Sequence, residues 1–274
     1  MDDNNNLFKE FQSVLKNPIM IEGIDQYLID WRGVFKGKVK FVVFPSTTEE
    51  VSKILKLANK NNIPIVPQGG NTGLCGGATP DNSGNSILIN FTKLNNIRNI
   101  DLLGNTVTVE AGCILENVLN IVQEKDRIFP INLAAKGSCT IGGNLATNAG
   151  GINVLKYGST RDLVLGIEAV LPNGEVINNL NSLHKDNTGY ALHKLLVGSE
   201  GTLALITAAT IKIFKKPITC LTAYSPSMAK ILDGKVTACT NHVFRFEAVN
   251  TFRVFNAQYR QYLRKVYRSA DTVI

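Results

Sequence analysis

The chain has 274 residues, 44% of them hydrophobic, and a formal net charge of +7 at pH 7. This length permits one large α/β domain or two modest ones with buried cores, so size excludes neither an enzyme nor a binding protein. The start is acidic and polar, and no apolar run approaches the roughly 20 residues of a membrane span, so we expect no secretory signal and no transmembrane helix. Five scattered cysteines without a Cys-x-x-Cys pair indicate free thiols. These features predict a cytoplasmic protein, with peripheral membrane contact as the alternative.

The positive charge is concentrated at the C-terminal end. Residues 218–274 contain eight Lys/Arg and three Asp/Glu, and they hold eight of the twenty aromatic residues. Basic and aromatic residues that alternate, as between Arg253 and Arg268, are one pattern of a nucleic-acid site, but a solvated amphipathic helix has the same pattern. We expect no nucleic-acid partner. Composition predicts three parts: an N-terminal segment 1–38, a main domain 39–217 and a short basic and aromatic tail 218–274.

The first predicted elements form a β-α-β unit. Residues 39–44 predict a strand that ends at Pro45. Ser46 and Glu49 have the spacing of a capping box, and apolar residues at helical intervals extend a helix to about residue 61. An apolar run at 63–66 then predicts a second strand, which completes the unit.

Further elements indicate that the pattern stays mixed. The sequence predicts strands at 87–91 and 106–110, a helix at 114–123, and a hairpin whose strands, 163–170 and 176–177, flank an Asn-Gly turn. A helix at 190–196 and a strand at 203–214 follow. The fold class is therefore α+β.

A glycine-rich segment follows the strand at 63–66 directly, with five glycines between residues 67 and 77. Glycine lacks a Cβ, so we expect Gly70 and Gly73 to adopt φ > 0 and let backbone N–H groups converge on an anion such as a diphosphate. The spacing is not Gly-x-Gly-x-x-Gly, and no Gly-Lys-Ser/Thr completes a P-loop, so neither a Rossmann NAD site nor an ATP site is supported. A mobile surface loop is the alternative.

A second glycine-rich segment, residues 135–151, favours a binding site over a mobile surface loop. Two such segments, separated by strands and a helix, can clamp a dinucleotide from both sides. Their Asn, Thr and Ser residues supply neutral hydrogen bonds, and few basic residues lie near in the sequence. We therefore expect backbone dipoles to meet the phosphate charge.

Five motifs carry a resemblance to a known family. They are Pro-Gln-Gly-Gly-Asn-Thr-Gly-Leu at 67–74, Ala-Lys-Gly-Ser-Cys-Thr-Ile-Gly-Gly-Asn at 135–144, Ala-Thr-Asn-Ala-Gly-Gly at 146–151, Lys-Asp-Asn-Thr-Gly-Tyr at 185–190 and Gly-Ser-Glu-Gly-Thr-Leu at 198–203. These motifs resemble the FAD-linked oxidases of the vanillyl-alcohol oxidase superfamily, which have a PCMH-type FAD-binding domain, and are most similar to the D-2-hydroxyglutarate and D-lactate dehydrogenases. The resemblance implies two α/β subdomains with FAD between them.

The resemblance also implies which residues contact the cofactor. Relatives that attach FAD covalently often have a histidine at the position of Asn71, and asparagine cannot form that bond, so we expect non-covalent FAD. A thioether to Cys139 is the alternative, although a buried structural thiol is the usual role of such a residue. The implied contacts are Pro67, Gln68, Gly69, Gly70, Asn71, Thr72, Gly73, Leu74, Gly76 and Gly77 at the diphosphate, Gly137, Ser138, Ile141, Gly142, Asn144, Thr147, Asn148, Gly150 and Gly151 at phosphate and isoalloxazine, and Glu200, Gly201 and Ile206 at the adenosine end.

The chemistry implied by the resemblance is hydride transfer from the hydroxyl-bearing carbon of a small 2-hydroxyacid to FAD. Such a reaction needs a base for the hydroxyl proton and a cation for the carboxylate. In the resembled dehydrogenases these groups, with a histidine-rich metal site, lie in a second domain. The three histidines of this chain are not clustered, so we assign no catalytic residue and no metal site. Arg32, Lys156 and Arg161 are candidate charges near the flavin, with solvated surface positions as the alternative.

Three functions follow from these observations. The first is a dehydrogenase for a D-2-hydroxyacid that passes electrons from FAD to a quinone or an electron-transfer protein. The second is a catalytically incomplete FAD-binding remnant or subunit, lacking most of the substrate domain. The third is a nucleotide-binding protein without a redox role.

Overall fold

The structure, a computed structural model, describes residues 2–217, 219–225, 231–232, 235–236 and 242–248. The chain divides into two compact units, Met1–Lys215 and Lys216–Ile274. In the second unit, β11 (Thr219–Ser225) pairs antiparallel with β14 (His242–Ala248), and β12 (Ile231–Leu232) pairs with β13 (Lys235–Val236). The aromatic and basic stretch 253–268 lies outside the described residues.

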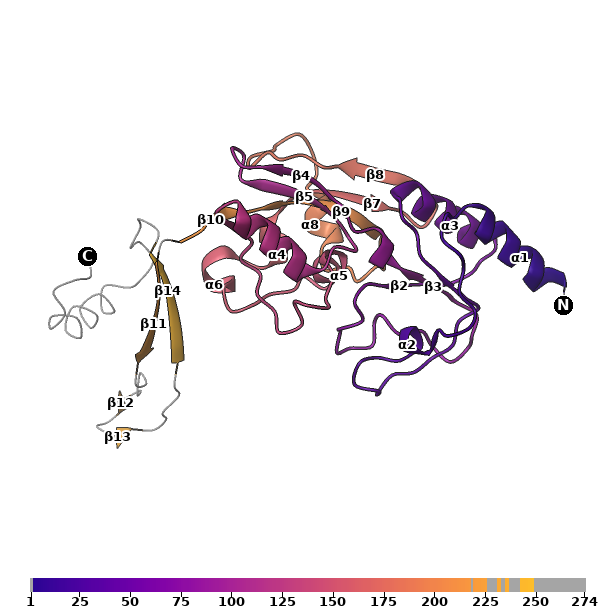
Figure 1. Cartoon of the computed structure of the whole chain (residues 1–274), viewed down its shortest axis with the longest axis horizontal. Coiled ribbons are helices and arrows are strands. Elements are labelled where there is room, and N and C mark those ends of the chain that lie inside the picture. The colour runs from indigo at the N-terminus through magenta and orange to yellow at the C-terminus, as the bar shows by residue number, and fades with distance from the viewer. Residues whose placement is uncertain (1, 218, 226–230, 233–234, 237–241, 249–274) are drawn as a thin grey trace. The chain divides into compact units, whose positions relative to one another are not determined.

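The first unit contains a three-stranded parallel sheet. It consists of β1 (Val42–Val43), β2 (Ile65–Gln68) and β3 (Ile87–Asn90), in the order β1-β3-β2. Two of these strands, β2 and β3, are labelled in Figure 1. α3 (Thr48–Lys60) connects β1 to β2, so the predicted β-α-β unit is confirmed, with β3 inserted between its strands. Strand β1 is shorter than the predicted 39–44.

The start of α3 differs from the prediction by one residue. Thr47, not Ser46, is the N-cap, and its hydroxyl accepts from Glu50 N at 3.2 Å. The Glu50 carboxylate reaches back to accept from Ser46 N at 2.6 Å and also accepts from Lys16 N at 3.1 Å. Glu50 is buried and Glu49 is exposed, so the long-range contact to residue 16 selects the later register.

A five-stranded antiparallel sheet forms the larger part of the first unit. Its order is β4-β5-β9-β7-β8, and the predicted hairpin between β7 and β8 is confirmed, with Gly174 at φ +82° in its turn. Strand β4 was not predicted, because its sequence Ile-Arg-Asn-Ile-Asp does not alternate cleanly. The strands are β4 (Ile97–Asp101), β5 (Thr106–Glu110), β7 (Val164–Val170), β8 (Val176–Asn179) and β9 (Leu205–Lys212); β6 (Arg127–Ile128) pairs separately with β10 (Phe214–Lys215).

The helices are mostly short. The predicted helix at 114–123 is confirmed as α4 (Leu115–Glu124), and the one at 190–196 is confirmed in part as α8 (Leu192–Leu196). The remaining elements were not predicted: α1 (Asp2–Ser13), α2 (Asp25–Leu28), the 3-10 turn η1 (Phe91–Lys93), α5 (Ile141–Ala146), α6 (Val154–Tyr157) and α7 (Thr160–Leu163).

The two larger hydrophobic cores of the first unit pack helices against the two sheets, and a small third one is formed by Val42, Phe44 and Leu88. Of the two larger cores, one packs α4, α5 and α8 against the five-stranded sheet, with Val118, Leu145 and Ile167 fully buried. The other packs α1 and α3 against the parallel sheet, and it includes Phe11, whose ring centroid lies 5.4 Å from that of Phe41. The N-terminal segment 1–38 therefore contributes to a core of the first unit.

A buried polar network joins α3 to the five-stranded sheet. Arg98 donates to both carboxylate oxygens of Glu168 at 3.0 and 3.1 Å, and to Glu110 at 3.1 Å. The Thr48 hydroxyl of α3 donates to Glu168 at 2.6 Å. Burial raises the pKa of Glu168, but its hydrogen-bond donors outweigh burial, so the pKa lies below its ordinary value.

Candidate functional site

The Gln68 side chain connects the start of the first glycine-rich segment to the residue that follows its end, Ala78. Gln68, at the end of β2, is buried, and its amide donates to Ala78 O and to Tyr27 O, both at 2.9 Å. Asn90 of the neighbouring strand β3 donates to Gln68 Oε1 at 3.2 Å. The loop therefore leaves and returns to one fixed point at the end of the parallel sheet.

Within this loop, the residues with positive φ are not the expected ones. Gly70 and Gly73 do not adopt positive φ, so that expectation was wrong; Asn71 (+51°) and Gly76 (+77°) do. Asparagine is among the few side chains that tolerate this region. At Gly76, a Cβ would lie 2.9 Å from the Phe35 ring, whereas a Cβ at Gly73 would meet nothing within 4 Å.

The two glycine-rich segments contact one another through their backbones. A Cβ on Gly70 would lie 1.8 Å from Ser138 O, and a Cβ on Gly69 would lie 2.1 Å from Thr140 Oγ1. These glycines are therefore needed because residues 138–140 approach, through the Ser138 backbone at Gly70 and the Thr140 side chain at Gly69, and not because of their φ. The structure brings together two segments that the sequence separates by strands and a helix.

We expected the second segment to be a loop, but it contains a helix. Its centre is the helix α5, which Thr140 caps by accepting from Gly143 N at 3.4 Å, and whose Ile141 and Leu145 enter the core. A Cβ on Gly142 would lie 2.7 Å from Ala111 Cβ, so this glycine permits close packing on β5 and the residues after it. Core burial therefore overrides the low helix propensity of two adjacent glycines.

Asn144 of α5 carries an unusual buried donor. The residue is 5% exposed, and its Nδ2 makes no hydrogen bond to an oxygen or nitrogen of the described residues. Burial raises the pKa of the neighbouring Cys139 thiol, and a hydrogen bond from the Asn144 side chain opposes that shift. A buried amide with no oxygen or nitrogen partner, beside a glycine cradle, fits a site that receives hydrogen-bond acceptors from a bound cofactor.

The turn at 198–201 contacts both glycine-rich segments. Gly198 N and Glu200 N donate to Leu145 O and Ala146 O, both at 2.9 Å, so the turn caps the C-terminal end of α5. A Cβ on Gly201 would lie 2.7 Å from the Pro67 ring. Glu200 adopts φ +52°, a strained conformation for a side chain of this type, and its Oε2 lies 3.2 Å from the Cβ position of Gly77.

The other expected contact residues lie around these three segments. Ile206 packs in a core, so only its backbone can face a ligand. Asn148, at φ +48°, accepts from Arg161 N at 2.8 Å, and Thr147 donates to Gly143 O at 2.8 Å. Thr72 is half-buried; Leu74 and Gly137 are exposed; and Gly150 and Gly151 pack closely on Val154 and Asn132.

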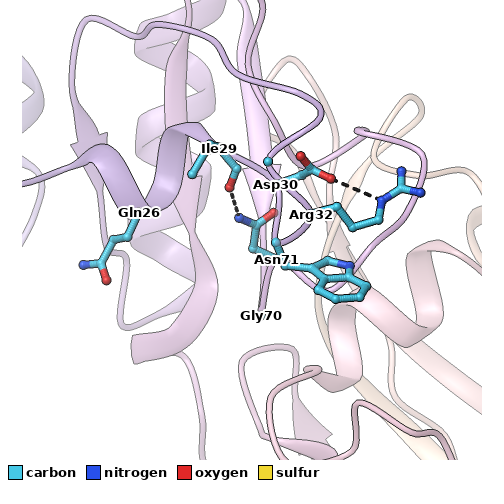
Figure 2. Close-up of a pocket in the computed structure, with 8 residues that line it drawn as sticks. Gln26, Ile29, Asp30, Arg32, Gly70 and Asn71 are labelled. Carbon is cyan, nitrogen blue, oxygen red and sulfur yellow. Dashed lines mark hydrogen bonds and ion pairs between the residues drawn. The ribbon is translucent and has the colours of Figure 1, made fainter.

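An open hollow lies beside the first loop (Figure 2). Asn71 Nδ2 donates to Ile29 O at 2.7 Å, Arg32 donates to Leu74 O, and the Arg32 guanidinium lies 3.5 Å from Asp30 Oδ2. Arg32 was proposed as a site residue from the sequence, but Gln26 and Asp30, which also line the hollow, were not. Only their closeness to Arg32 in the sequence could have indicated them. The hollow is lined by Gln26, Ile29, Asp30, Trp31, Arg32, Gly33, Gly70 and Asn71.

The other candidate charges have structural partners. Arg161 donates to Val197 O through Nε at 3.2 Å and Nη2 at 2.6 Å, and Lys156 lies 4.9 Å from the centroid of the Tyr157 ring. His184 Nε2 lies 3.1 Å from Gly104 O. Burial lowers the pKa of His193, with Lys194 acting in the same direction. The side chain of His242 lies outside the described residues.

The described residues offer neither a metal site nor a membrane-spanning helix. No group of three or more His, Cys, Asp or Glu residues among them could hold a metal ion. No helix in the same part of the chain is long and apolar enough to cross a membrane.

The family follows from comparison with known proteins. Residues 39–179 match the family model described as an FAD binding domain. The chain belongs to this FAD-binding family. The FAD-binding domain is also similar in fold to the solved structure of p-cresol methylhydroxylase with substrate bound, with a TM-score of 0.68 at 21% identity over 81% of this chain and 45% of that one. The α+β, PCMH-type fold expected from the sequence is confirmed, and FAD is the cofactor of this family.

Curated relatives of the FAD-binding domain are oxidoreductases. The chain is 47% identical to the mitochondrial D-2-hydroxyglutarate dehydrogenase of Danio rerio over 69% of its length, and 38% identical to the D-2-hydroxyglutarate–pyruvate transhydrogenase of Saccharomyces cerevisiae over 76%. It spans 35% of the first relative and 42% of the second. The resemblance to D-2-hydroxyacid dehydrogenases is thereby confirmed.

Proposed function

We propose that this chain provides the FAD-holding part of a dehydrogenase that oxidises a D-2-hydroxyacid, D-2-hydroxyglutarate or D-lactate. The observation that carries the proposal is the contact of Gly69 and Gly70 with residues 138–140, beside the buried amide of Asn144, in an FAD-binding domain with such relatives. FAD, when bound, supplies the acceptor for a hydride from the substrate carbon. The chain's own contribution is to hold and orient that acceptor.

The proposed cofactor residues are those assigned above by resemblance. Backbone N–H groups of the loop 67–77 face the diphosphate, because the nearest guanidinium, that of Arg32, already bonds Leu74 O and Asp30. Residues 137–151 line phosphate and isoalloxazine, and Glu200, Gly201 and the Ile206 backbone lie at the adenosine end. The proposed domain is 39–217, flanked by the segment 1–38 and the tail 218–274. The FAD is non-covalent, as expected from Asn71.

The partners proposed for this function are a small 2-hydroxyacid and an electron acceptor. The acceptor is a quinone or an electron-transfer protein; the name of the yeast relative offers pyruvate as a further candidate. No observation favours a nucleic-acid partner. For the compartment, the zebrafish relative's name supports mitochondria rather than the cytoplasm expected from composition.

Anaerobic titration tests the proposed activity. Flavin-loaded protein is mixed with D-2-hydroxyglutarate or D-lactate while the visible flavin absorption is followed, with the L-enantiomers as matched controls. Loss of the absorption with a D-substrate alone supports the dehydrogenase. A flavin that binds but keeps its absorption with every substrate supports the second candidate, an FAD-binding subunit without turnover. If the protein takes up no flavin, both candidates are contradicted. The remaining function is then the third one, a nucleotide-binding protein that has no redox role.

A further inference from the structure

Trp31 is the single tryptophan of the chain, and 65% of its surface is exposed. Tryptophan is usually well buried, so an indole this open marks a surface that receives another group. Val34 (64%) and Phe35 (40%) are also exposed, which makes the turn at 30–35 unusually apolar for a loop.

This turn is held rigidly. Asp30 is 2% exposed, and its Oδ1 accepts from Val34 N at 2.6 Å and from Phe35 N at 2.7 Å. Burial raises the pKa of Asp30, but the N–H donors of Phe35 and Val34, together with those of Arg32, outweigh burial and hold the pKa below its ordinary value. The carboxylate therefore keeps its charge and its bonds at neutral pH. The position of Trp31 is therefore set by the backbone beneath it.

The turn is also fixed to the first glycine-rich loop. Asn71 donates to Ile29 O, Arg32 donates to Leu74 O, and the Phe35 ring lies directly under Gly76. Trp31, Gly70 and Asn71 line the same hollow. A molecule that rests on the Gly70–Asn71 side of the loop must therefore lie beside the indole.

The hollow suits a flat aromatic ring better than an anion. The Asn71 amide already bonds the Ile29 carbonyl, and the Arg32 guanidinium is paired with Asp30 (Figure 2). Arg32 also donates to Leu74 O. Of the other lining residues, Asp30 is an acid, which disfavours an anion, and Trp31 presents an indole, which prefers to stack on, or meet edge-on, another π-system.

We propose that Trp31 is a cofactor-positioning residue, whose indole packs against the isoalloxazine ring of FAD seated on the loop 67–77. The inference rests on the proposed function and extends it by one binding residue outside the glycine-rich segments. At Gly70 and Asn71 it places the isoalloxazine end of the dinucleotide, in place of the diphosphate that the resemblance assigns to these two residues.

Flavin fluorescence tests the contact directly. An indole in contact quenches an excited flavin by donating an electron, which then returns, and phenylalanine cannot act as that donor. For Trp31→Phe loaded with FAD, we expect a longer fluorescence lifetime and brighter flavin emission than for wild type. Because the aromatic packing is kept, the FAD dissociation constant should change by less than about threefold, whereas Trp31→Ala should raise it about 3- to 10-fold. Val34→Ala, in the same turn, should leave lifetime and affinity unchanged.

The outcomes separate this inference from the proposed function. A lifetime that lengthens in Trp31→Phe but not in Val34→Ala supports the contact. If Trp31→Phe binds FAD and its flavin lifetime equals that of wild type, the inference is overturned while the proposed function stands. An unchanged lifetime is also expected if adenine, and not the isoalloxazine ring, occupies the hollow. If wild-type protein binds no FAD, both are overturned. Trp31→Leu, assayed in the same way, gives a second reading should the Phe variant unfold.

Discussion

Gly70 and Ser138 approach so closely that a single methyl group on Gly70 would lie 1.8 Å from the Ser138 carbonyl oxygen. This is a contact between two backbones, and neither can move far, since Gln68 fixes the end of β2 and Thr140 caps α5. The contact sets the spacing of the two segments between which we propose that the diphosphate lies.

Gly70→Ala should therefore lower both stability and FAD retention. Overpacking of this kind costs about 1–3 kcal/mol of the free energy of unfolding, and here the clash is with backbone, which relaxes poorly. Gly73→Ala is the matched control for stability, because a Cβ there meets nothing within 4 Å and φ is not positive. Thermal unfolding and the flavin-to-protein absorbance ratio measure the two effects. Equal unfolding temperatures for the two variants would contradict the packing argument.

Asn71 contributes to the loop in two ways that substitutions can separate. Asn71→Ala loses the bond to Ile29 O and places a side chain that disfavours φ +51°, so we expect a loss of about 2 kcal/mol. Asn71→Gly loses only the bond, and should cost about 1 kcal/mol. Urea unfolding measures both. If the Gly variant proved less stable than the Ala variant, the positive φ would not matter in solution.

The network around Glu168 should stabilise the first unit. Glu168→Gln removes the charge that Arg98 meets with two hydrogen bonds. We expect the free energy of unfolding to fall by about 2 kcal/mol. Breaking a fully buried ion pair costs roughly 3–5 kcal/mol, and the effect is smaller here because Arg98 is partly exposed. Glu175→Gln, an exposed glutamate on the β7–β8 turn, should change stability by less than about 0.5 kcal/mol.

The pH dependence of the same pair follows from the lowered pKa of Glu168. A carboxylate whose pKa is depressed in the folded state contributes stability above its unfolded value, here 4.5, and loses it as pH falls through the folded pKa. The stability difference between wild type and Glu168→Gln should thus be constant above roughly pH 5 and should narrow in acid. A difference that widened as pH fell would mean that the pKa is raised instead.

Much of the fold follows from local pattern, and the exceptions have identifiable causes. The strand at 106–110, helix α4 and the Asn-Gly hairpin were predicted because periodicity and turn residues agree there. Helix α5 was missed, since its two glycines suggest a loop and only the burial of Ile141 and Leu145 reverses that preference. The capping register at Thr47 depends on Lys16, a contact that no local pattern contains.

The candidate site was predicted in composition but not in geometry. Glycine content indicated the two segments. It could not indicate that Gly70 admits the Ser138 backbone and Gly69 the Thr140 side chain, and that neither adopts a positive φ. The strain at Glu200 and the apolar turn around Trp31 depend on tertiary contacts, which the sequence does not display. The burial of Ile206 limits that residue to its backbone for the same reason.

The cysteines should differ sharply in reactivity. Burial raises the pKa of the Cys113 thiol to about 11 and raises that of Cys139, whereas Cys75 is exposed. Iodoacetamide at neutral pH should label Cys75 in native protein and reach Cys113 and Cys139 only after unfolding. Peptide mass spectrometry resolves each site. Rapid native labelling of Cys139 would show that α5 opens easily and would weaken the argument for a fixed cradle.

Reconstitution with FAD tests the central claim most directly. Apo-protein incubated with FAD and freed of excess should retain one flavin per chain, with its visible absorption, and acid precipitation should release all of it into the supernatant because Asn71 offers no covalent linkage. Gly73→Ala should fold like wild type in the same experiment. A folded protein that stays colourless, or a flavin that remains in the acid pellet, would contradict the account.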